Sequence, residues 1–133
     1  MDTVEQQVHN GNRVVTDLTV TIGDFCRERG DGLVNVFAPH ATAGLAIIET
    51  GAGSDQDLVD TVHRLFPRDA RYRHAHGSHG HGADHVLPAV ISPSISIPVI
   101  DGRPALGIWQ SIVLVDTNGD NSHRTVRLSF LAG

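Results

Sequence analysis

The chain contains no lysine, and all ten of its basic side chains are arginine. Schiff-base enzymes and P-loop nucleotide sites both need a lysine, so the composition excludes both chemistries. The net charge of −5 with neutral histidines also argues against nucleic-acid binding, which needs a basic face. Any phosphate group recognised here must be held by arginine, by backbone N–H groups or by a metal ion.

Cysteine and long apolar runs are also scarce. The one cysteine, Cys26, excludes an internal disulfide framework and a multi-cysteine zinc site, and we interpret it as structural. No apolar run is long enough to cross a membrane, and the first seven residues lack the pattern of a signal peptide. We therefore expect a cytoplasmic protein without a membrane partner, folded as one domain over residues 1–133.

Alternating apolar residues predict mostly strands. The expected strands are 3–9 at a sheet edge, 13–22, 33–38, 45–49, 94–99, 105–116 and 124–131. Residues 17–19 offer an alternative, because Asp17 and Thr19 are also suited to opening a helix. A short helix is expected over 23–29. Hairpin turns are expected at 101–102 and 117–121.

One longer helix is predicted over 54–66. Leu58, Val62, Leu65 and Phe66 form one apolar stripe, Ser54 is placed to cap the start, and a proline follows the end. Many strands with about two helices predict a mostly antiparallel α+β sandwich.

Five of the nine histidines lie between residues 72 and 85. These are His74, His76, His79, His81 and His85. Imidazole is the commonest protein ligand for zinc and related ions, so this density predicts a metal site. Two interpretations are open for the middle three, His76, His79 and His81. They are extra ligands, or they belong to a flexible glycine-rich tract that binds metals adventitiously.

Several other segments occur in an order that is similar to a known family. The segments are Asp17-Leu18-Thr19, Pro39-His40-Ala41-Thr42-Ala43 with Glu49, Tyr72-Arg73-His74, His85 after its glycine-rich loop, Ser94 to Val99, Gly107-Ile108-Trp109-Gln110, and Arg124. Together they resemble the YjbQ-like family, also known as UPF0047, over nearly the whole chain. The chain departs from the family pattern in its three extra loop histidines and in Leu87, which stands where a lysine is expected.

The resemblance implies a small α+β sandwich that assembles as a homotrimer. It also implies a cleft of histidines and a glutamate that holds a metal or an anion. Some members of the family are credited with a weak thiamine-phosphate synthase activity. That reaction joins a pyrimidine pyrophosphate to a thiazole phosphate and releases pyrophosphate.

From the residues and the resemblance together, we expect His40, His74 and His85 to bind one divalent ion. The expected ion is zinc, with magnesium as the alternative for a pyrophosphate substrate. Glu49 would be a fourth ligand or a general base, with His40 beside it in the catalytic set, and Asp84 would orient an imidazole. His40 and Glu49 share a site only if His40 lies outside the strand or a bulge turns the chain.

Two further residues are expected at the substrate. Arg124 is placed to hold a phosphate by bidentate hydrogen bonding, and Gln110 to line the cleft. Trp109, the only tryptophan, is expected in the core or at a subunit interface.

Two functions fit these expectations. The first is a transferase or hydrolase that uses a metal ion on a small phosphorylated molecule, with thiamine-phosphate synthesis as a secondary activity. A dedicated synthase of that kind is expected on a (β/α)₈ barrel of roughly 250 residues, which is far longer than this chain. The alternative is a trimeric module that binds a metal or an anion without chemistry of its own.

Overall fold

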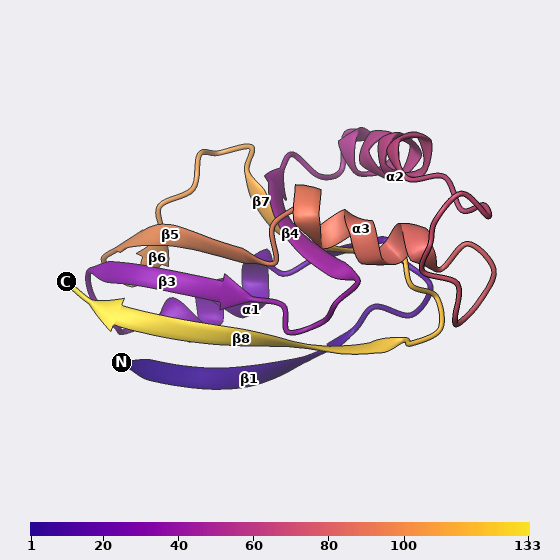
Figure 1. Ribbon diagram of the computed structural model, residues 1–133. Helices are drawn as coiled ribbons and strands as arrows, with labels where there is room; N and C mark the ends of the chain where they lie inside the picture. Colours follow the sequence, from indigo (N-terminus) through magenta and orange to yellow (C-terminus); the bar gives the residue numbers. More distant parts are fainter.

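The computed structural model describes residues 1–133 as two antiparallel sheets and three helices, which confirms the α+β class (Figure 1). The larger sheet has the strand order β1-β8-β3-β5-β6, and the smaller has the order β2-β7-β4. The strands are β1 (Asp2–His9), β2 (Val15–Asp17), β3 (Gly32–Phe37), β4 (Ala43–Ile48), β5 (Ser94–Ile100), β6 (Arg103–Pro104), β7 (Ser111–Asp116) and β8 (His123–Ala132). The helices are α1 (Thr19–Cys26), α2 (Ser54–Leu65) and α3 (Gly82–Val90).

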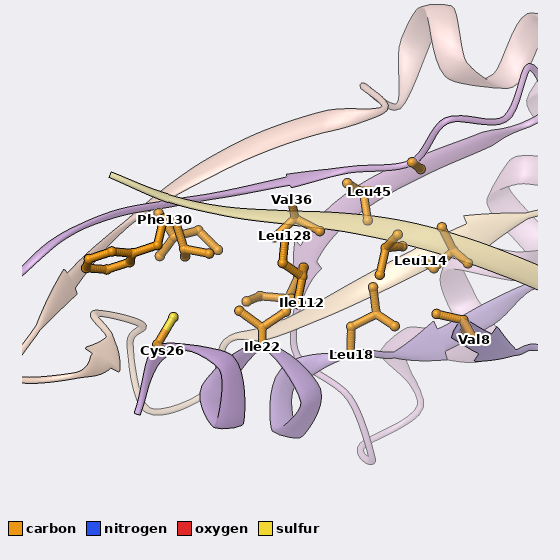
Figure 2. Packing of buried hydrophobic residues seen from close by; sticks show 14 of the residues in the cluster. Val8, Leu18, Ile22, Cys26, Val36, Leu45, Ile112, Leu114, Leu128 and Phe130 are labelled. Atoms are coloured by element: carbon orange, nitrogen blue, oxygen red, sulfur yellow. The ribbon is translucent and has the colours of Figure 1, made fainter. Parts of the chain in front are cut away.

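The main core lies between the larger sheet and a layer made of α1 and the smaller sheet. Alternate residues of the central strands point inward, as Val34 and Val36 do from β3 and Leu128 does from β8. From the other side α1 contributes Ile22 and Cys26, which are both fully buried (Figure 2). The buried position of Cys26 agrees with its structural interpretation.

A second, smaller core lies on the other face of β7. Val113 and Val115 pack there against Val62 of α2 and Leu87 of α3. Because β7 is buried on both faces, it fixes where α2 and α3 sit relative to the rest of the chain. These two helices, and the loop between them, carry the histidine-rich segment.

The structure confirms the strands expected at 3–9, 33–38, 45–49, 94–99 and 124–131, and the helix at 54–66. It corrects the expected strand over 13–22, of which only β2 is a strand. The alternative at residues 17–19 is the right one, because Asp17 Oδ1 accepts the Thr19 N–H at 2.8 Å where α1 begins. The helix expected over 23–29 therefore starts earlier, and it ends at Cys26.

Four other expectations need correction. Only the second half of the strand expected over 105–116 is formed, as β7, and Trp109 lies in the preceding loop with 70% of its surface exposed. Trp109 is therefore not a core residue, while the subunit interface and the homotrimer stay predictions. A third helix, α3, forms around Pro88, and Gly53 rather than Ser54 is the N-cap of α2. No helix is long and apolar enough to cross a membrane.

One close backbone contact holds the end of α3 against β4, and it allows a test of the packing. A Cβ on Gly44 would lie 2.1 Å from the carbonyl oxygen of Ile91, whereas a Cβ on Gly23 in α1 would meet nothing within 4 Å. We expect Gly44→Ala to lower the free energy of unfolding in urea by about 1–3 kcal/mol through overpacking. Gly23→Ala should raise it by about 0.5–1 kcal/mol through helix propensity. Equal effects of the two substitutions would contradict this packing.

Candidate metal centre

Three imidazoles converge where the loop after α2 meets the start of α3. One ring nitrogen from each of His74, His81 and His85 lies within 4.8 Å of the other two. His81 is the N-cap of α3 and His85 follows one turn later, so their rings share one face of the helix. Their Nε2 atoms form a hydrogen bond to each other at 2.9 Å. His74 comes from the loop, and its ring centroid lies 4.1 Å from that of His85.

Asp84 fixes the orientation of the His81 ring through a hydrogen bond. Its carboxylate is fully buried and accepts a hydrogen bond from His81 Nδ1 at 3.0 Å and another from Thr117 Oγ1 at 2.6 Å. Arg68 completes the set with an ion pair to the same carboxylate. Because His81 carries its proton on Nδ1, its free lone pair is on Nε2. This nitrogen faces His85. Carboxylates orient metal-binding imidazoles in the same way.

His74 supplies the observation that points most directly to a ligand. Its Nε2 atom is buried and has no hydrogen-bond partner. A buried polar atom without a partner is costly and uncommon in proteins. This nitrogen lies among other imidazoles whose nitrogens are aimed at the same region, so the donor set fits a metal ion that prefers nitrogen ligands.

The cluster also favours neutral imidazoles. The pKa of His74 is lowered by desolvation and then by the neighbouring His76 and His81. The pKa of His85 is lowered by burial first and then by the other rings, although Asp84 acts in the opposite direction. Only the neutral form offers a lone pair to a metal, so these shifts keep the donors available at mildly acidic pH.

The two remaining loop histidines differ in position. The exposed His76 ring lies 3.9 Å from the His74 ring, between centroids, while the His79 ring makes no such contact. A cleft of about 180 Å³ opens beside the loop. Its lining includes Tyr72 and the side of the cluster formed by His74 and His81.

Within one chain His40 does not join this group. It lies in the loop after β3, and its Nε2 atom is 3.0 Å from both the backbone N–H and the carbonyl oxygen of Thr125 in β8. The expectation that His40 binds the same ion as His74 and His85 is therefore not met by the geometry of a single chain. A shared site stays a prediction that would require a second copy.

Glu49 is also placed away from the cluster. The exposed Glu49 follows β4, whose register pairs Ala43 with Asp116 and Ile48 with Ser111. Thr117, which contacts Asp84 beside the cluster, therefore lies at the opposite end of β4 from Glu49. The six residues of β4 span about 20 Å, and this length separates Glu49 from the cluster. His40 lies outside β4, which was the condition for sharing a site with Glu49. However, Glu49 lies at the end of β4 that is farther from the histidine cluster.

The environment of His40 predicts a pH dependence of stability. Its pKa is lowered by burial and then by Arg124, while the bond to Thr125 and the charge of Asp116 act in the opposite direction. A histidine in the unfolded chain has a pKa of about 6.5, so the unfolded chain binds the proton first as the pH falls. Neutral His40 therefore contributes its full stabilisation at pH values above the unfolded pKa. This contribution is lost as the pH falls from the unfolded pKa to the lower folded pKa.

The test uses metal-free protein and urea unfolding between pH 7.5 and pH 5. In His40→Leu we expect a shallower dependence of the unfolding free energy on pH, by at most about 1.4 kcal/mol per pH unit for one proton. The comparison of slopes isolates His40, because the other histidines are common to both proteins. Identical slopes would show that His40 has the same pKa in both states.

The two expected substrate residues are engaged within the protein. Arg124 is only 6% exposed, and it donates from Nε to Asp116 at 2.6 Å and from Nη2 to Thr42 at 3.0 Å. Gln110 is exposed, and its side-chain oxygen accepts the Gly107 N–H at 2.7 Å. A role in substrate binding stays a prediction for both residues.

Sequence reasoning missed Arg68 and Thr117, and it named His81 only as a possible extra ligand, with a flexible metal-binding tract as the other interpretation. Neither Arg68 nor Thr117 has a local signal, because they reach Asp84 from separate loops. His81 and His85 did carry a signal. Two histidines four residues apart share a helix face, and a helix over 82–90 would have paired them.

Known proteins are similar to the whole chain. A family model described as UPF0047 protein YjbQ-like matches residues 4–133. A UPF0047 protein of Mycobacterium tuberculosis is 64% identical over 133 residues and covers 100% of both chains. One from Archaeoglobus fulgidus is 31% identical over 112 residues, which is 84% of this chain and 87% of the relative.

Solved structures share the fold. A hypothetical protein from Aeropyrum pernix K1 has 30% identity and a TM-score of 0.90, with 100% of both chains covered. A protein of unknown function from Sulfolobus solfataricus P2 has a TM-score of 0.91 at 19% identity, covering 99% of this chain and 97% of that one. The latter likeness concerns the fold alone.

Proposed function

The chain belongs to the YjbQ-like UPF0047 family, and from this premise we propose that it is a zinc protein acting on a small phosphorylated molecule. The ion is held by His74, His81 and His85. The observation that carries the proposal is the buried, unpartnered Nε2 of His74 beside two imidazoles aimed at the same region. Asp84 supports it by holding His81 in the tautomer that a ligand needs.

The donor set favours zinc over magnesium. Three imidazole nitrogens suit zinc, whereas magnesium prefers oxygen ligands and retains its waters. Three histidines are also the ligand number of catalytic zinc sites, which keep a further position for water or substrate. When bound there, zinc polarises a phosphoryl oxygen and lowers the pKa of a bound water.

A phosphorylated substrate would have to be held mainly through the metal. There is no lysine to neutralise a phosphate, and Arg68 and Arg124 are occupied by Asp84 and Asp116. The cleft beside the cluster, at about 180 Å³, has room for a small group rather than a large ligand. We propose transfer or hydrolysis of such a group, with the weak thiamine-phosphate synthase reaction as the named candidate.

The proposal is tested with metal-free and zinc-loaded protein in two assays. One measures pyrophosphate release from the pyrimidine pyrophosphate with the thiazole phosphate, and the other measures phosphate release from p-nitrophenyl phosphate. We expect turnover in at least one assay, dependent on zinc and lost in His81→Ala. Stoichiometric zinc without turnover in either assay would contradict the enzymatic proposal and leave a metal-binding module.

A further inference from the structure

We propose that His76 is a removable fourth ligand of this metal centre, carried by residues 75–80, which we call the lid. With His76 engaged, the ion has four imidazoles and no position for a substrate. With the lid displaced, the three histidines of the proposed site remain and the fourth position opens. This inference rests on the proposed metal centre and adds a means of regulating access to it.

The positions of the rings support a fourth ligand. The His76 centroid lies 3.9 Å from that of His74, 6.0 Å from that of His81 and 6.1 Å from that of His85. Imidazoles on one tetrahedral ion have centroids about 5 Å apart, as follows from nitrogen–zinc bonds of about 2 Å. The ring nitrogens of His76 lie outside the group of nitrogens within 4.8 Å of one another, so a movement of the lid is needed to bring His76 to the same ion. No other histidine of the chain makes ring contacts with all three.

The lid lies directly against the cluster. Gly77 has a φ of +85°, and a Cβ at this position would lie 2.7 Å from Cδ2 of the His81 ring. Glycine adopts this conformation without strain, and its missing side chain lets the backbone pass so close to the imidazole. The residue after His76 therefore passes close to the buried His81, so His76 lies near the ion when the lid is closed.

The attachments of the lid are few and weak compared with those of the buried ligand. Ser78 donates to Asp120 at 3.0 Å, and Arg68 reaches Ser78 Oγ and the carbonyl oxygen of His79 at 3.4 Å each. At the end next to α3, the carbonyl oxygens of Ser78 and Gly80 accept the backbone N–H groups of His81 and Ala83 at 3.0 Å each. Ser78 and His79 are exposed, in contrast to the buried His81 with its hydrogen bond to Asp84. Segments with few buried contacts and exposed hydrogen bonds open first. His76 therefore leaves the ion more easily than His81.

The test uses Co²⁺ as the bound metal and azide as an exogenous ligand, with the absorption spectrum as the readout. If His76 fills the fourth position nine-tenths of the time, the apparent azide Kd of the wild type is about tenfold weaker than the intrinsic value. We therefore expect azide to bind about tenfold more tightly to His76→Ala. Asp120→Ala, which frees Ser78, should shift the affinity in the same direction by less. The matched control is His79→Ala, which removes an imidazole from the lid but not from the cluster, and it should behave as the wild type.

The outcomes separate this inference from the metal centre itself. Full Co²⁺ binding with equal azide affinity in the wild type and His76→Ala overturns the role of His76 and leaves the centre standing. Loss of Co²⁺ from His76→Ala shows a permanent ligand and also overturns it. A wild type that binds no Co²⁺ overturns both proposals.

Discussion

Replacing His81 by alanine should lower the affinity of the protein for zinc by more than about a hundredfold. Loss of a residue that merely orients a ligand costs 10–100-fold in metal affinity, and in the proposed site His81 is a ligand as well as the oriented group. It is the buried member of the cluster, and its Nδ1 is held by Asp84 at 3.0 Å. The measurement is a competition titration against a chromophoric zinc chelator.

Two matched variants identify which histidines matter. His63→Ala removes an exposed imidazole from α2 and should leave zinc affinity unchanged. His40→Ala should do the same, because His40 Nε2 is hydrogen bonded to the backbone of Thr125. If His40→Ala lost zinc and His81→Ala retained it, the ligand set expected from the sequence, His40 with His74 and His85, would be restored.

Arg124→Ala should lower the free energy of unfolding by about 3–5 kcal/mol, the range expected when one partner of a buried ion pair is removed. Asp116 is 3% exposed and Arg124 is 6% exposed. The substitution leaves the Asp116 carboxylate without its cation and also removes a donor to Thr42. Urea unfolding at neutral pH measures the loss.

The same strand provides the control. Arg127, three residues along β8, pairs with Glu5 at 2.9 Å, but their side chains are 41% and 57% exposed. Exposed ion pairs contribute about 0–1 kcal/mol, so Arg127→Ala should have a small effect. Similar losses in the two variants would mean that burial does not set the strength of the Arg124 pair.

Most strands could be predicted because each has one face in the core. In β3, β5 and β8 inward apolar residues alternate with outward ones, and this period survives in the sequence. The segment 19–26 could not be assigned in the same way. Its β-branched residues favour a strand by propensity, but Ile22 and Cys26, four residues apart, are both buried by the sheet. Tertiary packing overrides local propensity there.

The composition of the candidate site was predictable, and so was part of its membership. His74 and His85 were expected together, but His81 takes the place expected for His40. The density of histidines in the sequence by itself indicates a metal. Which histidines meet is decided by contacts between distant segments, such as Arg68 with Asp84 and Thr117 with Asp84. Periodicity carries no information about these contacts. The same holds for Glu49, whose position follows from the register between β4 and β7.

The most direct test of the metal centre is X-ray absorption spectroscopy on protein purified without a histidine tag and loaded with zinc. We expect one zinc per chain with a first shell of three or four nitrogens at about 2.0–2.1 Å. The scattering from the outer atoms of imidazole rings should also be present, and it should be lost in His81→Ala. A shell of oxygen atoms alone, or zinc that remains nitrogen-bound in His81→Ala, would contradict a site built on His74, His81 and His85.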